Sequence, residues 1–373
     1  MIIKNADVFC EDGVFRSKDI CTDGEVFSSS SLDDQILDAE GCYAIPGLVD
    51  IHFHGCVGYD FCDGTEEAIQ NMAAYEAENG VLAICPATMT LAEDKLMTIA
   101  EAAAGYKGGV GADLVGINME GPFINEAKKG AQNPAYIHAP DVDMYRRLQK
   151  ASNGLFKLVD IAPETEGAMN FIRQVKDEAV ISIAHTAADY DTAVKAIEYG
   201  VSHVTHLYNA MPGYSHRAPG VIGAACDYGL NVELICDGIH IHPSAVRTTF
   251  KMFGDDHIIL ISDSMMATGM DDGTYQLGGQ DVKVVGNRAT LAEGGAIAGS
   301  ATNLMDCLRT AVKEMNIPLE SAVKCASQNP AKSIGIYEKY GSISNGKYAN
   351  LVLLDQDLKL QNIIHRGKQR NLS

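Results

Sequence analysis

The middle of the chain alternates apolar runs of strand length with amphipathic stretches of helix length. Near-continuous apolar strands that alternate with helices are typical of a parallel sheet covered by helices on both faces. About eight such runs can be counted, which favours a closed (β/α)8 barrel, or TIM barrel, over an open sheet within the α/β class. They are LVDIHFHG, VLAICPATM, LVGINME, FKLVDIAPE, AVISIAHT, GVSHVTHL, NVELICDG and HIILISD.

Both ends of the chain follow another pattern, in which short β-like pieces are separated by turn residues. Asp12-Gly13 and Asp23-Gly24 mark turns near the start, and Asn345-Gly346 marks a hairpin-type turn near the end. We therefore expect one small β domain built from residues 1–45 and 339–373, with the barrel occupying residues 46–338.

Helix signals lie between the apolar runs. One helix is expected to start after Thr65, with two glutamates in its first turn, and to stop at Gly80. Two more are expected over residues 189–199 and 301–315. These placements agree with a parallel sheet covered by helices.

Composition and charge narrow the possible partners. Hydrophobic residues make up 46% of the 373 positions and charged residues 21%, as in globular proteins. The formal net charge of −20 leaves no basic patch, so neither nucleic acid nor an anionic membrane is expected as a partner. No apolar run approaches the ~18 residues of a membrane span and no signal-peptide pattern opens the chain, which predicts a cytoplasmic protein. An anionic substrate would need Arg, Lys or backbone N–H groups to reverse the local field.

The cysteines agree with a reducing compartment. Ten are scattered along the chain without a C-x-x-C pair, which fits reduced thiols better than a disulfide framework. Cys56 is near His54 in the sequence, so whether it contacts a metal is left open.

Polar residues gather at the carboxyl ends of the apolar runs, which is the active-site face of a barrel. Each one alone could be a satisfied polar side chain at a strand end, but their joint occurrence on one face is harder to explain in that way. Imidazole and carboxylate ligands that leave an open coordination position describe a catalytic Zn²⁺ or Fe²⁺ site, and so predict metal-assisted hydrolysis. The residues are His52, His54, Glu120, Glu164, His185, His206, Asp237, His240 and Asp263.

Strand parity separates some of the histidines. His52 and His54 are two residues apart, so on a strand both rings point to the same side. His203 and His206 are three apart and would face opposite sides. If His206 points inward, His203 is expected to face the helix layer and to be structural.

Several longer motifs, taken together, resemble the N-acetylglucosamine-6-phosphate deacetylases of the amidohydrolase superfamily. The H-x-H pair alone would imply only the superfamily, whereas EGPF, THLxNAM and RxPG together are similar to this family. The resemblance covers nearly the whole chain and implies a metal-dependent TIM barrel with a small β-sandwich built from both chain ends. The motifs are PGLVDIHFHG, EGPFINEAKKGAQNP, SIAHT, VTHLYNAMPGYSHRAPG, CDGIH, ISDSMMATG, IAGSATNL and GKYANLVLLD.

The resemblance also implies roles for individual residues. Glu120, His185 and His206 would hold the principal metal, and His52 and His54 would hold a second one with help from Asp263, giving one or two Zn or Fe ions per subunit. Asp263 would be the general base and then the general acid in hydrolysis of the N-acetyl group, which gives glucosamine 6-phosphate and acetate in amino-sugar catabolism. The family implies a homodimer in which a neighbouring subunit completes the phosphate site. The substrate-binding residues would be Ala131, Gln132, Asn209, Ala210, Arg217, His240, Ile297, Ala298 and Gly299.

One position departs from some relatives. Gln132 stands where a histidine is often found beside the reacting carbonyl. Its amide can donate a hydrogen bond to a developing oxyanion but cannot become cationic. An aromatic face for the sugar could come from Tyr136, Tyr208 or Tyr214.

Two other functions are weighed against this one. The first is an amidohydrolase acting on N-acetylgalactosamine 6-phosphate, a cyclic amide or an N-acyl amino acid. Cyclic-amide hydrolases and N-acyl amino acid deacylases commonly bridge their metals with a carboxylated lysine, and here the corresponding strand ends in Glu120. The second is a sugar-phosphate sensor without catalysis, which Asp263 disfavours because binding alone needs no general base.

Overall fold

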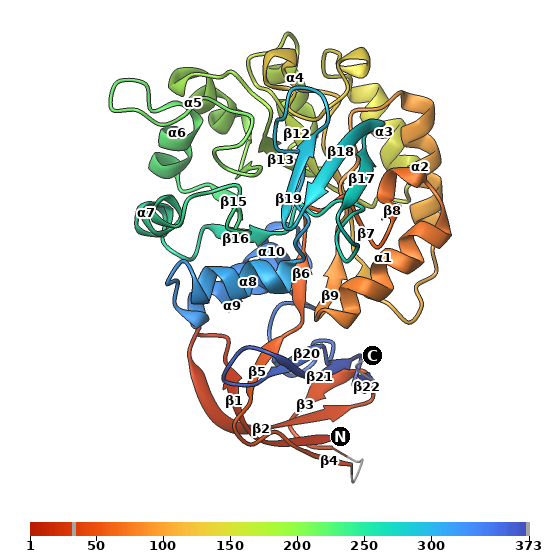
Figure 1. Cartoon of the computed structure of the whole chain (residues 1–373), viewed down its shortest axis with the longest axis vertical. Helices are drawn as coiled ribbons and strands as arrows, with labels where there is room; N and C mark the ends of the chain where they lie inside the picture. Colours follow the sequence, from red (N-terminus) through yellow and green to blue (C-terminus); the bar gives the residue numbers. More distant parts are fainter. Residues whose placement is uncertain (32–34, 371–373) are drawn as a thin grey trace.

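A run of parallel strands with helices around it forms the larger part of the protein (Figure 1), in a computed structural model that describes residues 1–31 and 35–370. Its parallel strands form two sheets, one in the order β10-β9-β6 and one in the order β11-β12-β13-β14-β15-β16. Their bounds are β6 (Leu48–Asp50), β9 (Val81–Ile84), β10 (Asp113–Leu114), β11 (Ile117–Met119), β12 (Phe156–Ile161), β13 (Val180–Ile183), β14 (His203–Val204), β15 (Asn231–Ile235) and β16 (Ile258–Ile261).

Backbone contacts join the ends of these two sheets. A parallel bridge pairs Ala87, just after β9, with Asn118 in β11. At the other end, the N–H of Asp263 after β16 donates to the carbonyl of His52 after β6, at 2.9 Å. The strands therefore curl so that their carboxyl ends face a common centre.

The helices cover the outside of this curled arrangement. Apolar side chains of the helices and strands form one large buried core, which is the main source of stability for a fold of this kind. The expected helix after Thr65 is α1, whose first turn is capped by the Thr65 hydroxyl at 3.1 Å from the N–H of Ala68. The helix expected over residues 301–315 is shorter, since α8 begins after the Asn303 cap. The helices are α1 (Glu66–Glu78), α2 (Glu93–Gly105), α3 (Val142–Ala151), α4 (Ala168–Val175), α5 (Tyr190–Tyr199), α6 (Gly220–Tyr228), α7 (Pro243–Phe253), α8 (Leu304–Lys313), α9 (Leu319–Ala326) and α10 (Gln328–Ser333), with short 3-10 turns η1 (Phe61–Asp63), η2 (Glu126–Lys128) and η3 (Pro134–Tyr136).

Strands from both ends of the chain form a separate sheet at one end of the molecule (Figure 1). Its order is β22-β21-β20-β5-β1-β2-β3, and β4 pairs with the first half of β1. Residues 43–46 of β5 pair with residues 351–354 of β20, so the two ends of the chain are joined through hydrogen bonds. The strands are β1 (Ile2–Phe9), β2 (Phe15–Asp23), β3 (Val26–Ser28), β4 (Ile36–Asp38), β5 (Tyr43–Pro46), β20 (Leu351–Leu354), β21 (Leu360–His365) and β22 (Lys368–Arg370).

The strands of the expected small β domain form, among the described residues, one hydrogen-bonded sheet that branches at β1, where β4 pairs with residues 2–4 and β5 with residues 7–8. One detail differs from expectation. The turn at Asn345-Gly346 is present but does not join two paired strands; the two-residue hairpin turns follow Asp23 and His365 instead. Asn-Gly favours a tight turn whether or not the flanking residues pair.

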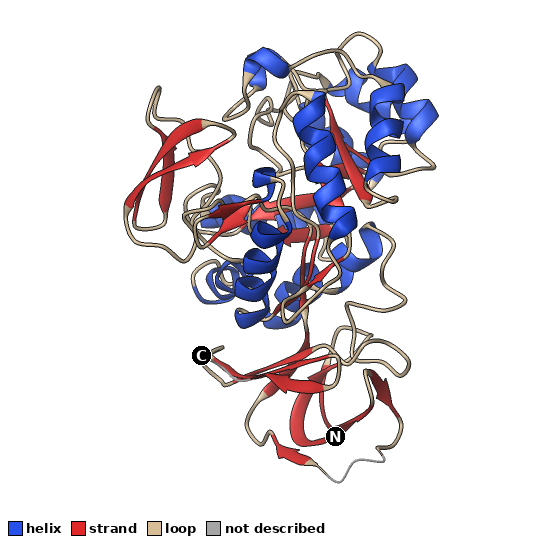
Figure 2. Ribbon diagram, turned by 90° about the vertical axis from the view of Figure 1, so that its right-hand side faces the viewer, coloured by secondary structure: helices blue, strands red, loops and turns tan. Residues whose placement is uncertain are grey.

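Figure 2 shows a small three-stranded sheet that projects from the side of the larger part. It consists of β17 (Gly273–Leu277), β18 (Gln280–Val285) and β19 (Arg288–Leu291), and sequence analysis did not predict it. The signal was available, because Gly278-Gly279 and Gly286-Asn287 each separate two strand-like runs by two residues. A two-stranded ribbon, β7 (Gly55–Cys56) and β8 (Tyr59–Asp60), follows the H-x-H segment.

Within the described ranges, no helix combines the length and the apolar character that crossing a membrane requires.

Candidate metal centre and active site

The candidate ligands sit where parallel strands end. His52 and His54 follow β6, Glu120 follows β11, His185 follows β13 and His206 follows β14, and all are buried. Asp263, which follows β16, is buried beside them.

The backbone turns sharply at three of these positions. His185, His206 and Asp263 have φ values of 43°, 29° and 49°, in the left-handed region that residues other than glycine seldom adopt. Such strain persists only where the surroundings impose it, and it is found most often at functional sites. Here it allows side chains from different strands to converge.

One group consists of Glu120, His185 and His206. The Oε1 atom of Glu120 lies 3.0 Å from Nε2 of each histidine, and the two Nε2 atoms are 3.2 Å apart. Nδ1 of His185 lies 2.9 Å from the Lys128 carbonyl, which can only accept, so the neutral ring carries its proton there. Its Nε2 lone pair then faces a carboxylate oxygen. Two acceptors in contact are unfavourable unless a cation lies between them, which fits a bound metal ion.

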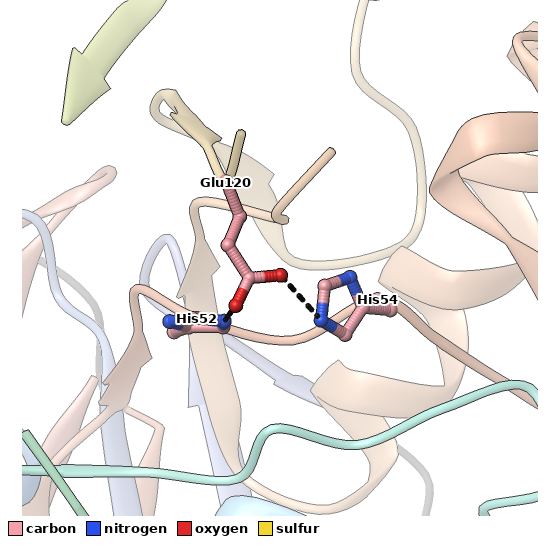
Figure 3. A group of neighbouring side chains, drawn as sticks. All are labelled: His52, His54 and Glu120. Carbon is pink, nitrogen blue, oxygen red and sulfur yellow. Dashed lines mark ion pairs between the residues drawn. The ribbon is translucent and has the colours of Figure 1, made fainter. Parts of the chain in front are cut away.

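A second group consists of His52, His54 and Glu120 (Figure 3). Nε2 of His54 is 3.3 Å from Oε2 of Glu120, and Nε2 of His52 is 3.5 Å from Oε1. Oδ1 of Asp263 lies 3.3 Å from Nε2 of His54 and 3.8 Å from Nε2 of His52. In each group the ligand atoms lie within 4.8 Å of one another. Glu120 belongs to both groups and could bind an ion in either or bridge two. The imidazole and carboxylate ligands therefore fit one or two divalent ions.

The charges of the histidines and carboxylates compensate each other. Burial would raise the pKa of Glu120, but the charge of His52 and the adjacent imidazoles of His185 and His206 outweigh it and hold the pKa well below its usual range. Burial also raises the pKa of Asp263, yet the hydrogen bond from His54 and the charge of His52 lower it overall. Both carboxyl groups are therefore ionised at neutral pH and able to bind a cation.

A cavity of about 310 Å³ opens above these ligands. Its lining contains most of the predicted substrate-binding residues, and sequence analysis missed its apolar members Met89, Leu277 and Ala296. A neighbouring cavity of about 450 Å³ is lined instead by residues such as Asp60, Lys95 and Tyr136, so Tyr136 lies outside the ligand-bearing cavity. The larger cavity's lining includes none of the ligand set. The ligand-bearing cavity is lined by His54, Met89, Glu120, Gly130, Ala131, Gln132, His185, His206, Asn209, Ala210, His240, Asp263, Leu277, Ala296, Ile297, Ala298 and Gly299.

Gln132 and His240 provide polar groups in this cavity. The side-chain amide of Gln132 donates to Oε2 of Glu120 at 2.6 Å and accepts from the N–H of Thr90 at 2.7 Å, so the side chain is fixed at both ends. Nδ1 of His240 lies 2.7 Å from Oδ2 of Asp237. Burial lowers the pKa of His240, but the hydrogen bond and charge of Asp237 outweigh it and raise the pKa, which favours a cationic ring.

Other predicted residues lie elsewhere. Arg217 is exposed in the segment 213–218 and is not part of the cavity lining. Glu164 accepts hydrogen bonds from Asn125 at 2.8 Å and from Thr186 at 2.6 Å, so it braces two loops beside the site. The thiol of Cys56 contacts the carbonyl of Met72 in α1, which is a packing contact, and Cys56 is in neither ligand group.

Sequence analysis missed Glu233 and gave His203 an incomplete role. His203 does meet the helix layer, with Nδ1 3.0 Å from the hydroxyl of Ser333 in α10. Its Nε2, however, lies 3.1 Å from Oε1 of Glu233, whose Oε2 lies 3.0 Å from Nδ1 of His52. The only signal in the sequence was a charged residue within the apolar run NVELICDG.

Comparison with known proteins gives a consistent picture. Residues 43–372 match the amidohydrolase family. The chain is 36% identical over 373 residues to N-acetylglucosamine-6-phosphate deacetylase of Bacillus subtilis (strain 168), covering 98% of this chain and 93% of the relative. It is 31% identical over 350 residues to N-acetylgalactosamine-6-phosphate deacetylase of Escherichia coli O157:H7, covering 93% and 92%. A solved structure of a mutant N-acetyl-D-glucosamine-6-phosphate deacetylase from Mycobacterium smegmatis, in complex with N-acetyl-D-glucosamine-6-phosphate, matches with a TM-score of 0.92 and 30% identity, covering 99% of this chain and 98% of that chain.

Proposed function

Because this chain belongs to the amidohydrolase family, we propose that it is a metal-dependent deacetylase that hydrolyses N-acetylglucosamine 6-phosphate to glucosamine 6-phosphate and acetate. The observation that carries this proposal is the pair of ligand groups sharing Glu120, with Asp263 beside them, at the floor of one cavity. The relatives named above supply the substrate class.

We also propose the finer architecture. Eight strand positions, in the order β6, β9, β11, β12, β13, β14, β15 and β16, form a closed barrel over residues 46–338, supported by the backbone contacts after β9 and β16. Residues 1–45 and 339–373 form the small β domain. The free state of all ten cysteines supports a reducing, cytoplasmic location.

The metal would be Zn²⁺ or Fe²⁺, because imidazole and carboxylate ligands suit both ions. Glu120, His185 and His206 would hold the principal ion, and His52, His54 and Glu120, with Asp263, a second one. When bound, such an ion lowers the pKa of water and polarises the acetyl carbonyl.

Asp263 is assigned the proton transfers. Its carboxylate would take a proton from the attacking water as the new C–O bond forms at the acetyl carbon. It would then give that proton to the departing nitrogen as the C–N bond breaks, leaving acetate and the free amine. Its ionised state supports the first role, and its place on the cavity wall, 3.3 Å from Nε2 of His54, supports both.

The remaining residues would orient the sugar phosphate. Ala131, Asn209, Ala210 and the turn 297–299 line the cavity, where they would contact the acetamido group and the sugar ring. His240 would supply positive charge in an otherwise acidic protein because, despite its burial, the hydrogen bond with Asp237 raises its pKa. Arg217 lies outside the cavity of its own chain, so we propose that it reaches the phosphate across a homodimer interface, completing the neighbouring subunit's site.

Replacing Arg217 by glutamine tests phosphate recognition. We expect kcat/KM for N-acetylglucosamine 6-phosphate to fall about 10- to 100-fold, because a hydrogen bond to a charged group contributes about 1.5–3 kcal/mol. Slow turnover of unphosphorylated N-acetylglucosamine should not change. The matched control is Arg16→Gln, an exposed arginine of β2 paired with Asp12 in the small sheet. Equal losses on both sugars would contradict the assignment of Arg217 to the phosphate.

Replacing Gln132 by alanine tests the group that contacts Glu120. The variant removes the hydrogen bonds to Glu120 and Thr90, and we expect kcat/KM to fall about 10- to 100-fold with the metal content unchanged. Gln280→Ala is the control, since Gln280 donates to the carbonyl of Ala131 in the same loop without touching Glu120. A similar loss in both variants would indicate that loop placement, and not the amide at position 132, is responsible.

A second substrate is favoured by one observation, the 31% identity to the Escherichia coli enzyme named for N-acetylgalactosamine 6-phosphate. Turnover of both epimers under the same conditions decides between them. A preference for the galacto epimer would keep the reaction and change the substrate.

A further inference from the structure

Glu233 lies beneath the candidate metal centre, and among the described residues His206 is the only member of the cavity lining that hydrogen-bonds to its side chain. Glu233 is on β15 and is fully buried. Its neighbours His52, after β6, and His203, on β14, are also fully buried. Its Oε2 accepts from Nδ1 of His52 at 3.0 Å and from the backbone N–H of His206 at 3.1 Å. Its Oε1 faces Nε2 of His203 at 3.1 Å. A buried carboxylate with partners on both oxygens is a fixed part of the structure.

These contacts determine where the protons lie. An ionised carboxylate can only accept, so Nδ1 of His52 carries its proton toward Glu233, and in the neutral form that binds a metal ion the lone pair of the ring is at Nε2. Among the described residues, Nε2 of His52 is a buried atom without a hydrogen-bond partner, 3.5 Å from Oε1 of Glu120. The proton on Nε2 of His203 likewise points to Glu233, which leaves Nδ1 of His203 to accept from the Ser333 hydroxyl at 3.0 Å. A single chain of hydrogen bonds thus runs from α10 through the strands to His52.

We propose that Glu233, supported by His203 and Ser333, is the positioning residue that makes the His52–His54 group able to bind a metal ion. The carboxylate holds the ring of His52 in the tautomer and orientation that direct its Nε2 lone pair at the ligand position. The Glu120–His185–His206 group depends on it much less, since Glu233 reaches that group only through a backbone amide. The inference rests on the proposed function and deepens it, because it makes metal binding at the second position depend on Glu233.

A purely structural role would have different consequences. If Glu233 only satisfied buried histidines, its replacement would lower the unfolding temperature and weaken both ion positions alike. The positioning role predicts that metal binding weakens at the His52–His54 position and is retained at the Glu120–His185–His206 position. The affinity of the first is therefore compared with that of the second in the same molecule.

Two replacements of Glu233 separate charge from hydrogen bonding. Glu233→Gln keeps the volume and can still accept from His52, so it should fold and weaken the second ion position about tenfold. Glu233→Met removes the acceptor and should weaken it about 100-fold; changes of about 10- to 100-fold are typical for such partners of metal-binding histidines. Asp160→Asn is the matched control, because Asp160 is fully buried in the same region and accepts from Thr205 at 2.7 Å without a hydrogen bond to a ligand histidine.

The experiment is a titration of the metal-stripped full chain with Zn²⁺ against a chromophoric chelator, with bound zinc counted by mass spectrometry. We expect two ions in the unmodified protein and in Asp160→Asn, and selective, graded weakening of one ion in the Glu233 variants, with the unfolding temperature unchanged in Glu233→Gln. Equal weakening of both ions, an effect no larger than that of Asp160→Asn, or a single ion in the unmodified protein would overturn the proposal. The readout needs no turnover: two ions with this pattern but no acetate release would support the inference and refute the proposed function.

Discussion

Replacing Asp263 by asparagine should lower kcat for N-acetylglucosamine 6-phosphate by about 10²- to 10⁴-fold, the range expected for loss of a general acid–base group. Asparagine has nearly the same shape and can still contact His54, but it cannot take a proton from water or return it to the amine. Binding of zinc at the principal position and binding of the sugar phosphate should persist. Steady-state kinetics, zinc analysis and ligand titration on one preparation measure all three quantities.

Asp160→Asn serves as the control for this variant, since it changes another buried carboxyl group that is outside the cavity lining and, within the described part of the chain, forms no hydrogen bond to a ligand ring. Its turnover should stay within about tenfold of the unmodified protein. Should Asp263→Asn keep its turnover, the proton transfers must be assigned to another group. If it bound neither zinc nor sugar phosphate, Asp263 would be chiefly a structural ligand.

Replacing Glu120 by glutamine should remove both ions and nearly all activity. Glu120 is the one residue present in both ligand groups, and its charge compensates the surrounding histidines. Loss of a metal ion removes several kcal/mol of transition-state stabilisation, which corresponds to about a thousandfold or more in rate. Zinc counting and acetate release measure the two effects.

His54→Gln is the informative comparison, because His54 belongs to only one of the two groups. It should lose the second ion and keep the one held by His185 and His206. A Glu120→Gln protein that still held one ion tightly would show that the two groups do not share this ligand in the way proposed.

Much of the site could be predicted because parallel strands place their carboxyl ends at one edge. His185, His206 and Asp263 could be grouped for that reason, although they lie far apart in the sequence. The motifs added the family, and the resemblance to N-acetylglucosamine-6-phosphate deacetylases is confirmed by the relatives.

Strand parity was a weaker guide at His203. Alternation between faces holds only while the strand continues, and β14 ends at Val204. His206 lies beyond that end with a φ of 29°, so its direction does not determine that of His203. This is why His203 can reach Glu233 as well as Ser333, a connection that depends on how β14 and β15 lie beside each other.

Arg217 could not be placed from the sequence for another reason. A loop arginine gains its role from whatever lies opposite it, and within one chain Arg217 is exposed. The three-stranded sheet was missed although its turn dipeptides were visible, because the apolar runs around it are short and half-exposed.

The most direct test of the central claim is release of acetate from N-acetylglucosamine 6-phosphate compared with unphosphorylated N-acetylglucosamine, with metal content determined on the same sample. We predict turnover of the phosphorylated sugar that is abolished by a chelator and restored by zinc or iron. Absence of acetate release from a sample shown to hold its metal would contradict the proposed function.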